Sequence, residues 1–152
     1  IRSLGVKLKL NPTKTVLKNK SIILIDDSLV RGTTCHKIVK MLYDAGAKEV
    51  HVRIACPEII YPDFYGIDMP TKKELLAFNK SNKEMCNYIN AKSLKFLSLE
   101  GLYKALGFNK RNESYPQFSD HYFTGDYPIQ PSDTLDQEEI SQLSLLSSKS
   151  SN

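Results

Sequence analysis

The hydrophobic residues of this chain form short runs and helical spacings that are typical of an α/β protein. Ile22–Ile25 are a continuous apolar run, as expected for a parallel strand buried on both faces. A helix over residues 33–45 should follow, because apolar residues recur there at i, i+3, i+4 and i+7: Ile38, Met41, Leu42 and Ala45. Residues 50–56 then alternate between apolar and polar, which predicts a second strand. These elements predict a right-handed β-α-β unit.

Further elements are expected downstream. Two capping boxes predict short helices that begin near residues 72 and 82, namely Thr71 with Glu74 and Ser81 with Glu84. Residues 94–97 should form another strand and residues 99–106 another helix. We therefore expect an α/β fold over residues 1–131, with a mainly parallel sheet flanked by helices. Residues 132–152 are polar and serine-rich, which predicts a C-terminal tail.

Composition narrows the class of protein. A chain of 152 residues forms at most one domain. Its three cysteines have no CxxC spacing and are odd in number, which indicates reduced thiols in a cytoplasmic protein. No apolar stretch reaches membrane-spanning length. The net charge of +4 comes with dispersed lysines and no nucleic-acid motif, so neither a membrane nor nucleic acid is an expected partner.

The candidate chemistry lies directly after the first strand. Asp26 and Asp27 fall at the strand's carboxyl end, where open α/β sheets place their ligands. Ser28–Thr34 follow with hydroxyl groups and one glycine, and Thr34 opens the helix, whose first N–H groups and dipole favour an anion. A pair of aspartates alone is usually a solvated turn. The apolar strand before it and Arg31-Gly32-Thr33-Thr34 after it favour a phosphate site here.

Two carboxylates beside a phosphate cradle suit a phosphorylated ribose. The carboxylates can accept hydrogen bonds from a vicinal diol or hold the waters of Mg²⁺. The loop amides and hydroxyls can hold a terminal phosphate. Neither G-x-x-x-x-G-K-[ST] nor G-x-G-x-x-G is present, so the two common nucleotide-binding loops are excluded.

The segment from Ser21 to Thr34 resembles the phosphoribosylpyrophosphate (PRPP) motif of type I phosphoribosyltransferases, which have a Rossmann-like fold. The resemblance narrows to the glutamine PRPP amidotransferases through motifs that occur in the family's order. These are Gly5–Asn11, Asp27–Thr34, Ala45–Ala47, Phe64–Pro70, Phe96–Leu102 and Phe123–Pro128. Several ordered motifs are far more specific than one, and they extend over the chain up to about residue 128.

The resemblance implies a pentosyltransferase of de novo purine biosynthesis. In this family an N-terminal glutaminase domain releases ammonia from glutamine, and a C-terminal phosphoribosyltransferase domain joins it to C1 of PRPP. The chain resembles only the later part of the second domain, and position 1 is Ile1, not the family's nucleophilic cysteine. The missing glutaminase domain is therefore an expected partner, and the full-length enzyme is expected to be a homo-oligomer.

The resemblance also assigns residues. The PRPP contacts fall on Asp26, Asp27, Ser28, Arg31, Gly32, Thr33 and Thr34, with Asp26 and Asp27 on ribose hydroxyls or Mg²⁺ waters. Lys9 falls on the lysine that contacts pyrophosphate, a role suited to a flexible ammonium group. One branch of the family carries an iron–sulfur cluster. Asp63 stands where that branch has a cysteine and residues 115–122 contain none, so a cluster-free member is implied.

Two other functions remain open from the sequence. A different type I phosphoribosyltransferase would share the loop but accept a nucleobase. The absence of a recognisable base-binding segment counts against it. A non-enzymatic remnant or split fragment of a longer enzyme would bind a phosphoribosyl ligand or nothing, and activity of the chain by itself does not follow from the motifs.

Overall fold

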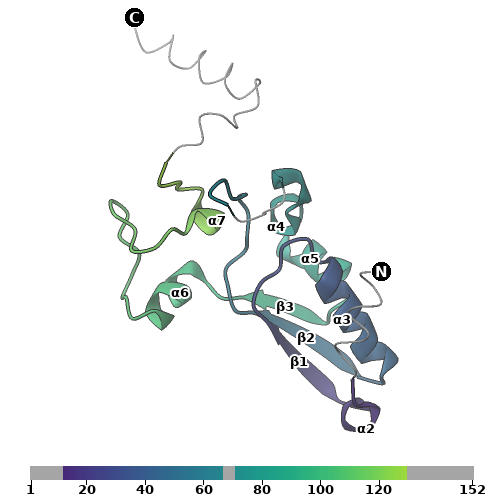
Figure 1. The fold of residues 1–152 in the computed structure, drawn as a ribbon. Coiled ribbons are helices and arrows are strands. Elements are labelled where there is room, and N and C mark those ends of the chain that lie inside the picture. The colour runs from purple at the N-terminus through teal and green to yellow at the C-terminus, as the bar shows by residue number, and fades with distance from the viewer. Residues whose placement is uncertain (1–11, 67–70, 130–152) are drawn as a thin grey trace, which may run out of the picture.

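The structure is a computed structural model, and it describes residues 12–66 and 71–129. The chain forms three strands and a series of short helices (Figure 1). In chain order the elements are α2 (Lys14–Leu17), β1 (Ser21–Asp26), α3 (Thr33–Asp44), β2 (Glu49–Ile54), η1 (Lys72–Glu74, a 3₁₀ turn), α4 (Leu76–Asn79), α5 (Asn82–Tyr88), β3 (Ser93–Phe96), α6 (Leu99–Ala105) and α7 (His121–Thr124).

The strands form a parallel sheet in the order β1-β2-β3. Ser21–Asp26 pair in register with Glu49–Ile54, and His51–Ile54 pair with Ser93–Phe96. Helices α3 and α5 lie on the same side of this sheet, and α6 and α7 lie beyond the carboxyl ends of the strands (Figure 1). The α/β fold with a mainly parallel sheet and flanking helices, predicted from the periodicities, is confirmed.

The core lies between the sheet and the α3–α5 layer. Both the sheet and the helix layer contribute fully buried residues to it. These include Val39 of α3, Val50 and Val52 of β2, and Met85 of α5. Alternate residues of β2 are buried, as expected for a strand whose covered side faces the helices. Leu29 belongs to the same cluster at 3% exposure, which anchors the loop after β1 in the core.

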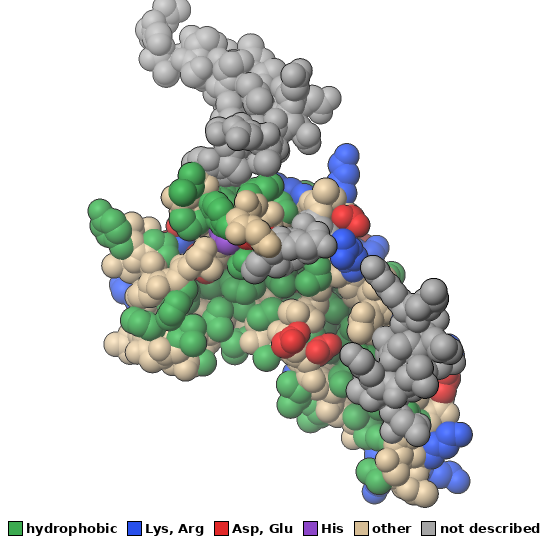
Figure 2. Space-filling model, viewed as in Figure 1, with side chains coloured by type: hydrophobic (Ala, Val, Ile, Leu, Met, Phe, Trp, Pro, Cys, Tyr) green, Lys and Arg blue, Asp and Glu red, His purple; other side chains and the backbone are tan. Residues whose placement is uncertain are grey.

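The opposite face of β1 is uncovered by the described residues. Its side chains alternate between partly covered and exposed, and Ile23 and Ile25 retain 65% and 73% of their accessible surface. Hydrophobic side chains cover much of the face turned to the viewer in Figure 2, with lysines and arginines mainly at the rims. Within residues 12–66 and 71–129, the expectation of a strand buried on both faces is therefore not met, because the helix layer covers only one face of β1.

Most predicted elements match the structure within two residues. The helix predicted near residue 72 is instead the 3₁₀ turn η1, which is followed by α4. The pattern predicted neither α2 nor α7, each of which has four residues and so shows no helical period. Lys9 and the tail over residues 132–152 lie outside the described residues. No helix in the described residues is both long and apolar enough to cross a membrane.

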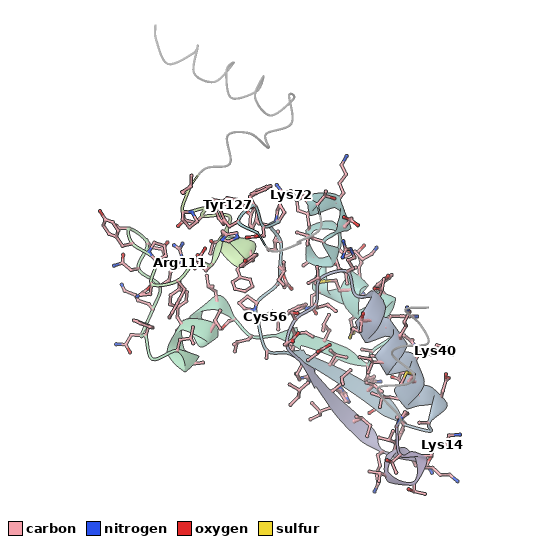
Figure 3. The ribbon with its side chains drawn as sticks, in the orientation of Figure 1. Lys14, Lys40, Cys56, Lys72, Arg111 and Tyr127 are labelled. Carbon is pink, nitrogen blue, oxygen red and sulfur yellow. The ribbon has the colours of Figure 1, made fainter. Side chains whose placement is uncertain are left out.

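Buried polar contacts join the segments beyond the sheet. Asp120 accepts hydrogen bonds from Arg111 Nε at 2.7 Å and from the Tyr103 hydroxyl at 2.8 Å. His121 Nε2 lies 2.9 Å from Asp63 Oδ1, and both side chains are almost fully buried. These contacts hold α7 against α6 and against the segment that follows β2. In Figure 3, Arg111 and Tyr127 lie beside α7.

Candidate phosphate-binding site

The site is built at the carboxyl end of β1, where the chain leaves the sheet. The Asp26 carbonyl still accepts a hydrogen bond from Ala55 N–H at 2.9 Å, which continues the β1–β2 ladder to the last residue of the strand. Leu29 then enters the core. The loop is therefore fixed at its start by the sheet and in its middle by a buried side chain.

The two carboxylates are held by short-range hydrogen bonds. Asp26 Oδ1 accepts the Asp27 N–H at 3.1 Å, and Asp27 Oδ1 accepts the Ser28 hydroxyl at 2.8 Å. Asp27 is exposed and Asp26 is partly exposed, so both have oxygens that remain accessible to solvent. This arrangement can accept hydrogen bonds from hydroxyl groups or bind a hydrated cation.

The loop ends in a left-handed turn that opens α3. Gly32 has φ of 74° and ψ of −9°, a conformation that favours glycine because other residues carry a Cβ penalty there. Gly32 is the N-cap residue of α3, and among the described residues no side-chain hydrogen bond caps the helix. The first N–H groups of this 12-residue helix are therefore left to satisfy an anion or solvent.

These parts enclose a pocket of about 420 Å³, lined by residues 26–35 and Lys37. Thr33 and Thr34 are exposed within it. Lys37 lies one helical turn after Thr33 and adds a positive charge to the lining. The pocket thus joins two acidic groups to hydroxyls, an open helix N-terminus and a cation, which is a chemistry for a ligand that carries both hydroxyls and phosphate.

The buried thiol of Cys35 and the partly buried thiol of Cys56 lie near the two aspartates, and the pKa of each is raised. Burial and, to a smaller extent, the charge of Asp26 raise the pKa of Cys35 to about 11. Burial and then the charge of Asp27 do the same for Cys56, whose pKa is also about 11. Cys56 lies where the chain leaves β2, beside the start of the loop (Figure 3). Both thiols are therefore protonated at neutral pH and are poor nucleophiles.

The structure brings all seven candidate loop residues around one pocket, namely Asp26, Asp27, Ser28, Arg31, Gly32, Thr33 and Thr34. Arg31 also reaches Glu74, with a distance of 3.4 Å between Nε and Oε1. Lys9 lies outside the described residues. Lys37 was missed from the sequence, although its i+4 spacing from Thr33 places it on the same face of α3.

Comparison with known proteins identifies the family. No family model matches the chain. Over 149 residues, however, it is 51% identical to the amidophosphoribosyltransferase of Rhizobium etli, which covers 97% of this chain. The chain belongs to the amidophosphoribosyltransferase family. The Methanocaldococcus jannaschii amidophosphoribosyltransferase is 58% identical over 70% of the chain, and amidophosphoribosyltransferase 2 of Arabidopsis thaliana is 50% identical over 88%.

Solved structures agree with this assignment. The glutamine PRPP amidotransferase from B. subtilis, solved with ADP and GMP, matches 84% of the chain with a TM-score of 0.72 and 42% identity. A structure described as the allosteric regulatory enzyme of purine biosynthesis matches the same share with a TM-score of 0.68 and 40% identity. The type I phosphoribosyltransferase fold implied by the motifs is thereby confirmed.

The chain spans only part of the proteins it matches. It covers 30% of the Rhizobium etli protein, 22% of the Methanocaldococcus jannaschii protein and 28% of the B. subtilis chain. Membership in the amidophosphoribosyltransferase family therefore concerns this portion, and its catalytic role is a matter for proposal.

Proposed function

We propose that this chain forms the PRPP-binding part of an amidophosphoribosyltransferase, a pentosyltransferase that makes 5-phosphoribosylamine. In the reaction, a bond forms between C1 of PRPP and the nitrogen of ammonia derived from glutamine. The bond between C1 and the pyrophosphate oxygen breaks, pyrophosphate leaves with the electron pair, and the attached nitrogen gives up a proton to become the amine. Residues 1–131 would form the later part of the phosphoribosyltransferase domain, with the glutaminase domain and further copies of the enzyme as partners.

The observation that carries this proposal is the pocket that combines Asp26 and Asp27 with an uncapped helix N-terminus. The 5-phosphate would bind the N–H groups and hydroxyls of Ser28–Thr34. The ribose hydroxyls would bind the two carboxylates. The role of the chain is to position the ribose and stabilise charge, because catalysis of this displacement needs alignment more than acid–base chemistry.

The donor set at the end of β1 fits Mg²⁺. The described residues contain no group of three or more His, Cys, Asp or Glu side chains that could hold a metal ion. Mg²⁺ ordinarily uses one or two carboxylates and takes its other ligands from water and substrate phosphate, so Asp26 and Asp27 would be this segment's contribution to the metal site. When bound, the ion would offset the negative charge of pyrophosphate. Lys9 is proposed to contact the same leaving group.

A hybrid enzyme tests the proposal. This chain would replace the matching segment of the Rhizobium etli protein, and PRPP consumption would be measured with ammonia as the nitrogen donor. We expect activity in the hybrid and its loss in Asp26→Asn/Asp27→Asn, because both ribose contacts are weakened together. Asp44→Asn is the matched control, since Asp44 is an exposed residue at the far end of α3 that pairs with Lys40.

The outcomes separate the alternatives. Consumption of PRPP only when a nucleobase is supplied would favour another type I phosphoribosyltransferase. PRPP binding without turnover would favour a non-enzymatic remnant. Full activity in the double variant would contradict the assignment of the two aspartates.

A further inference from the structure

The left-handed turn of the phosphate loop is enclosed by side chains from a distant part of the chain. Gly32 is buried, and a Cβ built on it would lie 2.7 Å from Leu76 Cδ2 and 3.0 Å from Tyr88 Cε1. Neither of these residues lines the pocket. They pack on the outer side of the turn, against the backbone whose direction determines where the next N–H groups point.

The same distant segment also contacts the chain before and after Gly32. Leu76 N–H donates a hydrogen bond of 2.8 Å to the Val30 carbonyl. The Tyr88 carbonyl lies 2.9 Å from His36 Nδ1 in the first turns of α3. We call residues 71–88, which comprise η1, α4 and α5, the brace. Its contacts therefore flank the turn on both sides.

The brace is itself held by hydrogen bonds within it and by its packing into the core. The Ser81 hydroxyl and Glu84 carboxylate form a capping box that opens α5. The Asn79 amide donates to two carbonyls within the brace, with distances of 2.7 and 2.8 Å. Met85 of α5 is 1% exposed in the core between the sheet and the helices. The brace is thus a firm support for the loop.

We propose that Leu76 and Tyr88 are positioning residues for the phosphate loop, an inference that rests on the proposed PRPP site. They hold Gly32 in its left-handed conformation, and so direct the first N–H groups of α3 into the pocket. A glycine is needed because its Cβ-free backbone fits beneath both side chains, but glycine is also the residue with the most conformational freedom. The brace removes that freedom before the ligand binds, which lowers the entropy cost of binding.

The test uses Tyr88→Ala, in which the ring beside Gly32 is removed. In the Rhizobium etli hybrid we expect the KM for PRPP to rise about tenfold with kcat nearly unchanged, because the loop must be ordered at each binding event. In the isolated chain, hydrogen–deuterium exchange of residues 28–34 should become faster without ligand. Tyr88→Phe keeps the ring and should restore both values.

Two further variants separate positioning from general stability. Phe78→Ala is the matched control, because this aromatic side chain of α4 is 45% exposed and stacks under Lys72, not on the loop. It should change neither KM nor exchange. Leu76→Val trims the methyl closest to Gly32 and should give a smaller rise in KM, about twofold to threefold.

Each result decides for or against the inference. Unchanged loop exchange and unchanged KM in Tyr88→Ala would overturn it, as would an equal effect in Phe78→Ala. If the unsubstituted hybrid failed to use PRPP, the proposed function would fail, whereas loop exchange in the 152-residue chain would still test the brace. Faster exchange confined to the loop in Tyr88→Ala would support the positioning role of the brace, whether or not the hybrid uses PRPP.

Discussion

The uncovered face of β1 should cause the isolated chain to associate with itself. Ile23 and Ile25 lie on the same face of an edge strand and are 65% and 73% exposed. The strand sequence SIILID contains no lysine or proline, the residues that ordinarily protect an edge from pairing. A second copy can cover this face and pair with the edge of β1 that no described residue pairs with, so we expect a concentration-dependent oligomer.

The structure gives the size of the effect. Complete burial of an isoleucine side chain contributes about 1.5–3 kcal/mol, and most of each of these two side chains is exposed. Covering both therefore contributes about 2–4 kcal/mol per chain. Both copies of a dimer carry the substitution, so the loss is about 4–8 kcal/mol per dimer. Since 1.4 kcal/mol corresponds to a tenfold change, replacing both residues by a polar one should weaken association by about three orders of magnitude or more.

Sedimentation velocity over a range of concentrations measures this directly. Ile23→Thr/Ile25→Thr is the suitable variant because threonine keeps the β-branch and the strand propensity while adding a hydroxyl. The control is Val16→Thr/Leu106→Thr, which changes two apolar side chains that are 65% and 50% exposed but lie outside the sheet. A wild-type chain that stays monomeric, or a double variant that associates as tightly as wild type, would refute the reasoning.

The further predictions concern a buried charge and two thiols. Removing the buried partner of Arg111 in Asp120→Ala should lower the free energy of unfolding by about 3 kcal/mol in denaturant titrations, whereas Asp126→Ala, at an exposed partner, should cost under about 1 kcal/mol. Burial raises the pKa of Asp120, but the hydrogen bonds from Arg111 and Tyr103 together outweigh it, so the pKa lies below its ordinary value. That contribution is complete above the unfolded pKa of about 3.9 and is lost as the pH falls through the lower folded pKa, so Asp120→Asn should flatten the acid limb of the stability curve. Cys35 and Cys56 should react slowly with iodoacetamide at neutral pH and faster as the pH approaches their pKa of about 11, and rapid labelling of either in the native chain at neutral pH would contradict this.

The elements that the sequence predicted are those with a local cause. The helix over 33–44 follows from apolar residues at helical spacing, and α5 follows from a capping box whose partners are three residues apart. By contrast, α7 depends on His121, which pairs with Asp63 across 58 residues of sequence. A four-residue helix held by such a contact has no periodic signal, and so the pattern of the segment could not reveal it.

The exposure of β1 shows that a sequence pattern can predict a strand correctly without predicting its burial. Its apolar run matches that of a strand covered on both faces, and the run says nothing about which neighbours are present. Ile23 and Ile25 are exposed because no described residue covers their side of the sheet. The local prediction of a strand was therefore correct, while the prediction of its burial depended on residues beyond the pattern.

The phosphate site depends both on a local sequence motif and on contacts between segments that are distant in sequence. Its chemistry is contiguous in sequence, since residues 26–34 line one pocket, and this explains why a short motif was enough to indicate the ligand class. The residues that determine its shape, however, are distant from one another in the sequence. Glycine makes the turn at Gly32 possible but does not select it, because the residue has access to many other conformations. Selection must come from what surrounds the turn, and those surroundings are Leu76 and Tyr88. A loop motif therefore specifies what can bind, while the packing of a separate segment determines how much ordering the ligand itself must supply.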